Sequence, residues 1–285
     1  MALARLDGRI CLVTGATSGI GLETAAGLAA LGAQVVMVGR DRERGEQARK
    51  AVIERTGSRR VDLLLADLSS LAGVRGLAEE FLATHPALHV LVNNAGTVEL
   101  SRTTTVDGFE KTFAVNHLSY FLLTNLLLPR LRASAPSRIV NVASEAHRFG
   151  KLDLGDLQSE KSYQVMRVYG TSKLLNILFT ITLAGKLAGS GVTANCLHPG
   201  AVSTRLGTNN GVWARLLIGL LRPFFLTPEQ GAANSIFVAA SDQLEGVSGK
   251  YFVKQRAVSP SRRSQRPELA RRVWARSSEL VGLSA

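Results

Sequence analysis

The stretch that decides the fold is ICLVTGATSGIG, residues 10–21. It opens with Ile10–Thr14, a short apolar run of the kind that buried parallel strands show. Glycines follow at once, and apolar residues then recur at helical spacing from Leu22 to Leu31. Gly32 stands where a helix typically ends. The sequence therefore predicts a strand, a glycine turn and a helix in that order.

The glycine turn is suited to holding a phosphate. Gly15, Gly19 and Gly21 let the backbone approach a pyrophosphate, and the N-terminus of the following helix favours its negative charge. The spacing is G-x-x-x-G-x-G, which differs from the better-known G-x-G-x-x-G fingerprint. A glycine-rich turn without a ligand is the alternative. The strand and helix on either side favour a dinucleotide site.

The end of the next strand bears on which dinucleotide is bound. This strand is predicted at Gln34–Gly39, and Arg40 follows it directly. An acid in this region accepts the ribose 2′-hydroxyl of NAD, whereas an arginine can pair with the 2′-phosphate of NADP. Asp41 lies next to Arg40 and works against that preference, and a solvated loop arginine is the alternative interpretation. We expect NADP(H) to be preferred, with NAD(H) as the second candidate.

The run YGTSK, residues 169–173, carries a candidate acid–base pair. A long helix is predicted from Tyr163 to Leu187, and residues four apart on a helix share a face, so Tyr169 and Lys173 would point the same way. A free phenol has a pKa of about 10, and a neighbouring ammonium lowers it. Tyr169 could then protonate a ketone or deprotonate an alcohol. A chance pairing on an exposed helix is the alternative.

The rest of the chain continues the alternation of strand-like and helical runs. This pattern predicts an α/β fold, a Rossmann-type doubly wound parallel sheet of about seven strands with helices on both faces. We find no repeat, linker or low-complexity block. Residues 1–285 are therefore predicted to form a single dinucleotide-binding catalytic domain.

Composition argues against several other classes of protein. Apolar runs are broken before about 18 residues, so no transmembrane helix is predicted, and no secretory signal is visible. Cys11 and Cys196 fall in separate predicted strands and are expected to be reduced core residues, which favours a cytoplasmic location. No metal site is expected, since Pro86 breaks the histidine pair His85 and His89.

The formal net charge is +12, and arginines concentrate toward the C-terminus. Basic surfaces can bind nucleic acid, anionic membranes or acidic partners. No nucleic-acid-binding motif accompanies the arginines, and aromatic residues make up only 6% of the chain, so no nucleic-acid partner is expected. We expect a solvated basic helix at about 267–281, with weak peripheral membrane contact as the alternative.

Together with further segments, these motifs resemble the one-domain branch of the short-chain dehydrogenase/reductase family. The resemblance runs from Gly8 to about Gly282. In chain order, the further matching segments are Asp67-Leu68, Asn93-Asn94-Ala95-Gly96, Asn116, Ser144 and Pro199-Gly200-Ala201-Val202-Ser203-Thr204. The family resemblance implies the same fold, a nicotinamide cofactor and oxidoreductase activity.

The resemblance also implies roles for individual residues. Ser144 would hydrogen-bond the substrate oxygen and Tyr169 would act as acid and base. Lys173 would lower the tyrosine pKa and bind the nicotinamide ribose, and Asn116 would hold a water linking Lys173 to solvent. The implied cofactor-binding residues are Gly15, Thr17, Ser18, Gly19, Ile20, Gly21, Arg40, Asp67, Leu68, Asn93, Ala95, Gly96, Tyr169, Lys173, Pro199, Gly200, Val202 and Thr204.

A finer resemblance is to retinol-dehydrogenase-like and WW-domain-oxidoreductase-like members. It is carried by VNHL at 115–118, SEAHRFG at 144–150 and GVSGKYF at 246–252. It implies direct hydride transfer between NADP(H) and an apolar aldehyde, ketone or alcohol, retinal-like, steroid-like or xenobiotic. Many NADP(H) members carry a basic residue where Thr17 and Ser18 stand, so cofactor choice rests mainly on Arg40. Homodimers and homotetramers are common in the family.

Two features near the site leave alternatives open. Residues 204–228 are strongly apolar, and by resemblance this position forms a lid that would suit an apolar substrate. A helix at a subunit interface or a segment dipping into a membrane surface would have the same composition. His117 and His147, beside Asn116 and Ser144, are candidates either for the substrate pocket or for packing.

Two other functions share parts of this pattern. A nicotinamide-sensing regulator would bind the cofactor without turnover, but such proteins usually lose part of the Ser–Tyr–Lys set that is complete here. A sugar-nucleotide epimerase or dehydratase would favour a different glycine spacing and a longer C-terminal substrate domain.

Overall fold

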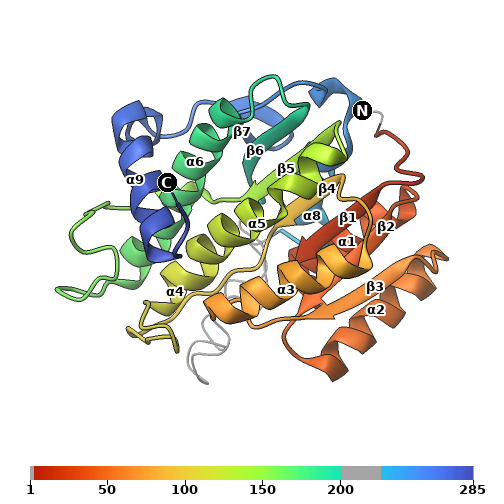
Figure 1. Ribbon diagram of the computed structural model, residues 1–285, viewed down its shortest axis with the longest axis horizontal. Helices are drawn as coiled ribbons and strands as arrows, with labels where there is room; N and C mark the ends of the chain where they lie inside the picture. The colour runs from red at the N-terminus through yellow and green to blue at the C-terminus, as the bar shows by residue number, and fades with distance from the viewer. Residues whose placement is uncertain (1–2, 201–225, 285) are drawn as a thin grey trace.

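The structure is a computed structural model that describes residues 3–200 and 226–284 (Figure 1). Its centre is an eight-stranded sheet with the order β3-β2-β1-β4-β5-β6-β7-β8. The strands are β1 (Ile10–Thr14), β2 (Gln34–Gly39), β3 (Val61–Leu65), β4 (Val90–Asn93), β5 (Ser137–Val142), β6 (Val192–His198), β7 (Tyr251–Val253) and β8 (Arg256–Val258). All neighbours pair in parallel up to β7, and β8 pairs antiparallel with β7. The predicted doubly wound parallel sheet is therefore confirmed.

The sheet has one strand more than the sequence predicted. The additional strand is β8, a short exposed strand that forms a hairpin with β7. Lys254 and Gln255 make the turn with φ values of 49° and 61°. Because β8 has no buried face, its sequence lacks the apolar pattern by which the other strands are predicted.

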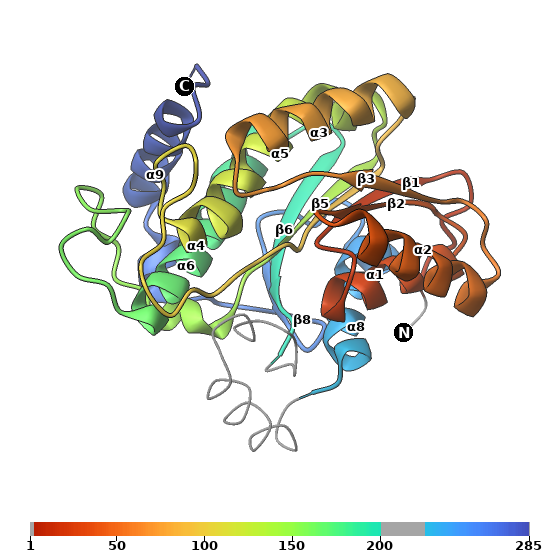
Figure 2. The same cartoon turned by 90° about the horizontal axis from the view of Figure 1, so that it is seen from below.

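Helices cover both faces of the sheet (Figure 2). One face carries α1 (Gly19–Ala30), α2 (Arg42–Thr56) and α8 (Pro228–Ala240), and the other carries α3 (Leu71–Thr84), α5 (Ser119–Ala133), α6 (Val165–Lys186) and α9 (Pro267–Leu280). Shorter turns are α4 (Lys111–Phe113), the π-helical η1 (Ala114–Leu118), and the 3₁₀ turns η2 (Glu145–Arg148), η4 (Asp242–Leu244) and η5 (Arg262–Gln265). None of the helices in the described segments is long and apolar enough to cross a membrane.

Side-chain alternation along the strands builds a core on each face. In β1, Ile10 and Leu12 pack toward α3 and α5, while Cys11 and Val13 pack toward α1 and α8. Successive strand residues point to opposite faces, so a strand buried on both sides is apolar throughout. Both cysteines of the described chain are buried and free, as expected.

Strand order places the functional region. The direction in which successive strands are added to the sheet reverses between β1 and β4. These two strands are neighbours although β2 and β3 lie between them in sequence. Ligands of open α/β sheets bind at such a switch point, outside the carboxyl ends of the strands. The register puts the ends of β1, β4, β5 and β6 at one edge. The segments that follow these strands therefore meet.

Candidate active site

A cleft of about 1100 Å³ lies at this edge of the sheet. It gathers most of the residues that the family resemblance implied, although they come from elements far apart in the sequence. Of those residues, the cleft is lined by Gly15, Thr17, Ser18, Gly19, Ile20, Gly21, Arg40, Asp67, Leu68, Ala95, Gly96, Ser144, Tyr169, Lys173, Pro199 and Gly200.

Two of the implied residues lie elsewhere in the structure. Asn93 does not line the cleft: its side-chain amide is buried in the sheet and donates to Thr124 Oγ1 at 2.9 Å and Asn141 Oδ1 at 2.8 Å. As the last residue of β4, Asn93 therefore braces the central strands, and Asn94 faces the cleft in its place. Asn116 is also buried away from the cleft lining.

Part of the expected site falls outside the described residues. This applies to Val202, Thr204 and residues 204–225 of the apolar segment that was expected to form a lid.

The first turn of α1 opens into the cleft without a cap. Ser18 precedes the helix in an extended conformation but makes no side-chain hydrogen bond to it, and the first turn contains no acidic residue. By contrast, Asp41, Ser70 and Thr227 cap α2, α3 and α8. Unpaired N–H groups at a helix N-terminus bind anions. The start of α1 therefore fits the pyrophosphate of a dinucleotide.

Glycine is required in this turn for two separate reasons. Gly15 and Gly19 have φ values of 65° and 57°, where a side chain is strained. A Cβ on Gly21 would lie 2.3 Å from Gly15 O and 2.4 Å from Asn94 Nδ2. Asn94 is held there by its Nδ2 donating to Thr14 O at 2.8 Å. The glycine turn is thus packed against the end of β4.

Two arginines line the far end of the cleft. Arg40 follows β2 and Arg44 lies in the first turn of α2, and both are exposed. Asp41 accepts a hydrogen bond from Arg44 N at 2.9 Å, so its carboxylate is used as the cap of α2. Sequence reasoning missed Arg44, although its place four residues after Arg40, in the first turn of the following helix, could have indicated it. The arrangement fits a 2′-phosphate, and the acid next to Arg40 is engaged elsewhere.

Tyr169 and Lys173 share the cleft-facing side of α6. Lys173 Nζ lies 5.6 Å from the centroid of the Tyr169 ring and donates to Val142 O at 3.0 Å. Burial raises the pKa of Tyr169 to about 12, against a hydrogen bond with Ser144 that lowers it. Burial also lowers the pKa of Lys173 to about 7.

The expected lowering of the Tyr169 pKa by Lys173 is not found in the structure, where burial decides the direction of the shift. Burial disfavours the charged forms of both side chains, so it raises the pKa of the phenol and lowers the pKa of the ammonium. At neutral pH the tyrosine keeps its proton.

Ser144 begins the loop that faces Tyr169. Its Oγ accepts from Ala146 N at 3.2 Å and caps η2. Its carbonyl accepts from His147 Nδ1 at 2.7 Å, and His147 Nε2 accepts from Ser261 N at 3.0 Å. His147 thus joins the serine loop to the C-terminal part of the chain. It acts in packing and does not line the cleft.

Asn116 lies in the π-helical turn η1, and its side-chain amide is engaged by the protein. Asn116 Oδ1 accepts from Thr97 N at 2.8 Å, and Nδ2 donates to Thr97 O and Ser172 Oγ, both at 3.0 Å. Both amide protons are used, so the side chain can offer a water only the remaining lone pair of Oδ1. Widened helical turns of this kind often occur at functional sites.

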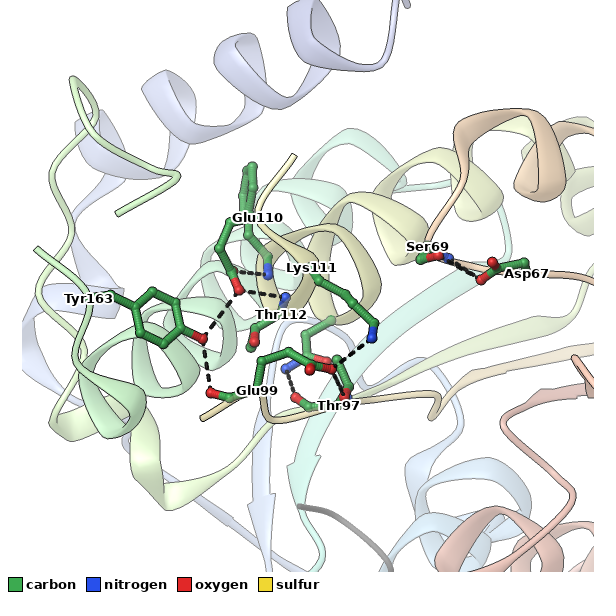
Figure 3. Close-up of polar contacts among 10 residues, drawn as sticks. Asp67, Ser69, Thr97, Glu99, Glu110, Lys111, Thr112 and Tyr163 are labelled. Carbon is green, nitrogen blue, oxygen red and sulfur yellow. Dashed lines mark hydrogen bonds and ion pairs between the residues drawn. The ribbon is translucent and has the colours of Figure 1, made fainter. Parts of the chain in front are cut away.

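A polar cluster holds the loop that carries Thr97 (Figure 3). Thr97 Oγ1 donates to Glu99 Oε1 at 2.9 Å, and Lys111 Nζ lies 3.2 Å from the same oxygen. Tyr163 Oη donates to Glu99 O at 2.9 Å and contacts the buried carboxylate of Glu110. Burial raises the pKa of Glu110. The cluster fixes Thr97 and Lys111 at the rim of the cleft, and none of it was foreseen from the sequence.

The remaining lining of the cleft includes two exposed apolar side chains. Phe149 is 68% exposed and Met166 is 56% exposed, and both line the cleft that also contains Tyr169. Large exposed apolar residues at a binding cleft indicate an apolar ligand.

Within the described residues, no group of three or more His, Cys, Asp and Glu side chains could hold a metal ion.

Comparisons of the sequence and of the fold with known proteins agree with one another. Residues 9–214 match the family model described as short chain dehydrogenase. Retinol dehydrogenase 12 of Mus musculus is 44% identical over 98% of this chain and 88% of the mouse protein. An uncharacterised protein from Mycobacterium paratuberculosis has a solved structure with a TM-score of 0.81 at 33% identity, over 99% of this chain and 96% of that one. The RhlG/NADP active-site complex of Pseudomonas aeruginosa has a TM-score of 0.70 at 31% identity, over 88% of this chain and 97% of that one.

Proposed function

Because the chain belongs to the short chain dehydrogenase family, we propose that it is an NADP(H)-dependent oxidoreductase that interconverts an apolar carbonyl compound and its alcohol. One observation carries the proposal: Ser144, Tyr169 and Lys173 line the same cleft as the uncapped start of α1. A proton donor and a phosphate-binding helix N-terminus in one cleft are what carbonyl reduction by a dinucleotide requires.

In the reductive direction, each group has a separate task. The nicotinamide, when bound, supplies the hydride. The Ser144 hydroxyl hydrogen-bonds the carbonyl oxygen, and Tyr169 Oη gives that oxygen its proton. Lys173 Nζ, which uses one donor on Val142 O, has further donors for the cofactor ribose and for returning a proton to Tyr169. Burial raises the pKa of Tyr169, so the side chain is protonated at neutral pH and can serve as the acid.

The proposed cofactor preference rests on two exposed side chains. Arg40 and Arg44 line the end of the cleft opposite Tyr169, and a pair of guanidinium groups suits a phosphate dianion. The solved neighbour described as an NADP complex supports the same choice. NAD(H), which lacks the 2′-phosphate, would leave both arginines unpaired.

The proposed substrate class follows from the other end of the cleft. Phe149 and Met166 offer apolar surface beside Tyr169. The relatives that bear the name retinol dehydrogenase make a retinoid the first substrate to test.

Buried free Cys11 and Cys196 support the cytoplasmic location expected from the sequence. A homodimer or homotetramer stays an expectation, to be tested by sedimentation.

The test is oxidation of NADPH and NADH against all-trans-retinal, a steroid ketone and medium-chain aldehydes, with the reverse reaction on the matching alcohols. We expect turnover with NADPH on at least one apolar carbonyl and much weaker turnover with NADH. Tight cofactor binding without turnover in either direction would favour a cofactor-sensing protein. Preference for small polar carbonyls would contradict the assigned substrate class.

A further inference from the structure

His117 is completely buried behind the active site, beside Asn116. Its ring packs among three phenylalanines, with Phe113 stacked at 5.7 Å and Phe179 edge-on at 6.3 Å between centroids. Its Nδ1 lies 3.2 Å from Asn176 Oδ1, and its Nε2 lies 2.9 Å from Ser277 Oγ. The imidazole therefore connects η1, α6 and α9.

The donors and acceptors of this group can be assigned by elimination. Asn176 Nδ2 lies 2.9 Å from Asn116 O and 3.4 Å from Val142 O, and two carbonyl acceptors require the amide NH₂ at that position. Asn176 Oδ1 then faces His117, so Nδ1 must carry the ring proton and donate. Nε2 is left as the acceptor of the Ser277 hydroxyl. Burial lowers the pKa of His117 to about 4, which keeps the ring neutral.

Asn176 connects the hydrogen bonds of His117 to the active site. Its NH₂ group binds the backbone carbonyl of Asn116 in the π-helical turn and that of Val142 at the end of β5. Val142 O is also the acceptor of Lys173 Nζ at 3.0 Å. The carbonyl that accepts from the lysine therefore also accepts from the Asn176 amide, whose other end, Oδ1, contacts His117 Nδ1.

We propose that His117 and Asn176 are positioning residues for the proposed reaction, setting the place of Lys173 and of the Asn116 turn through the Val142 and Asn116 carbonyls. The inference rests on the proposed function. Ser277 of α9 contacts the other ring nitrogen, Nε2, and lies outside the path from His117 through Asn176 to Lys173. Neither His117 nor Asn176 lines the cleft.

Two substitutions of His117 separate positioning from packing. In His117→Asn, the side-chain amide can replace Nδ1 and donate to Asn176, but the contact with Ser277 is lost. In His117→Gln, the longer side chain can replace Nε2 and accept from Ser277, but the contact with Asn176 is lost. Asn176→Leu removes the amide at similar volume. Ser277→Ala, which removes one buried hydrogen bond outside the path to Lys173, is the control for loss of stability.

The measurements are kcat and KM for NADPH-dependent reduction of all-trans-retinal, NADPH binding by fluorescence, and thermal unfolding. Since one net hydrogen bond is worth up to about 1.5 kcal/mol, we expect kcat to fall roughly tenfold in His117→Gln and Asn176→Leu. NADPH affinity should change by less than about twofold in both. His117→Asn and Ser277→Ala should keep kcat within about threefold of the wild type, whatever their unfolding midpoints.

Equal loss of kcat in His117→Asn and His117→Gln, following the unfolding midpoint, would reduce the role to packing and overturn the inference. Unchanged kcat in Asn176→Leu would do the same. Absence of turnover in the wild type would instead refute the proposed function. The contacts have their own test, because ring ¹⁵N spectra of the cofactor-free protein should show His117 protonated at Nδ1 alone between pH 5 and 8. A proton on Nε2 would contradict the assignment of Nδ1 as the donor to Asn176, on which the inference rests.

Discussion

Burial of Lys173 disfavours its positive charge, and the effect on the free energy of unfolding can be measured without a substrate. Burial lowers the pKa of Lys173 in the folded protein to about 7, from an ordinary value of 10.5. Between these values the unfolded chain binds more protons than the folded one, so the free energy of unfolding should rise with pH. The window is pH 7–8, below the ordinary pKa of 9.0 of the two cysteines and of 10.0 of Tyr169.

The matched variant is Lys173→Met, which keeps an unbranched side chain without the charge. Urea unfolding of the protein without added cofactor, at intervals from pH 7 to 8, should give a smaller slope of unfolding free energy against pH for the variant than for the wild type. Equal slopes would mean that Lys173 stays charged in the folded protein, and that the lowered pKa is wrong.

Arg40 and Arg44 carry the second prediction at this scale. Arg40→Ala and Arg44→Ala should each weaken NADPH binding by roughly ten- to a hundredfold, the worth of one charge-assisted contact of about 1.5–3 kcal/mol. NADH binding should stay within about threefold, since NADH has no group for either arginine. Titration of both cofactors by fluorescence checks this, with exposed Arg59 as the control position. Equal weakening of NADPH and NADH would remove the arginines from cofactor selection.

Residue-level prediction from the sequence succeeded where spacing alone determines position. Tyr169 and Lys173 share a face because a helix brings residues four apart together. The motif at 93–96 was expected both to steady the central strands and to lie along the cofactor, and one step along β4 divides these roles between Asn93 in the sheet and Asn94 in the cleft. Prediction from the sequence missed Lys111, whose place at the cleft rim depends on Glu99 of another loop.

Among the elements, α1 matters most for binding, since its uncapped N-terminus faces the cleft. Gly21→Ala would bring a Cβ to within 2.4 Å of Asn94 Nδ2 and within 2.3 Å of Gly15 O. Relieving this clash would require a displacement of the backbone at Gly15, which costs free energy. We therefore expect NADPH affinity to fall by at least about tenfold and the protein to lose stability.

The control for Gly21→Ala is Gly76→Ala in the interior of α3, where an added Cβ would meet nothing within 4 Å. It should raise the free energy of unfolding by about 0.5–1 kcal/mol through helix propensity and leave NADPH affinity unchanged. Calorimetry and cofactor titration on both variants provide the comparison. Unchanged NADPH affinity in Gly21→Ala would show that the packing of the turn does not govern binding.

The regular elements follow closely from local sequence, and the irregular ones do not. Strands β1 and β2 have the predicted bounds, and α6 differs from its predicted range by a residue or two at each end. The π-helical turn at Ala114–Leu118 was not predicted, because it is held by Thr97, Ser172 and Asn176 from other elements. Such a turn has no period of its own in the sequence.

The whole molecule places a phosphate-binding end, two arginines and an acid–base pair along one edge of one sheet. The sequence predicted this common edge, although not Arg44, because alternating strands and helices allow few topologies and the switch point of the parallel sheet determines where ligands bind. It could not predict the contact between His117 and Ser277 of α9, which joins residues 160 positions apart. Contacts of that range are set by packing, which no local pattern records.

The central claim is direct hydride transfer to an apolar carbonyl with Tyr169 as the acid. The measurement that tests it most directly uses NADPH deuterated at C4 of the nicotinamide, in each of its two stereochemical forms, with all-trans-retinal and medium-chain aldehydes. We predict that one form places deuterium on the carbinol carbon of the product alcohol. The Tyr169→Phe variant should bind NADPH within about threefold of the wild type yet lose about 10²–10⁴ in turnover. Product without deuterium from either form, or full turnover in Tyr169→Phe, would contradict the account.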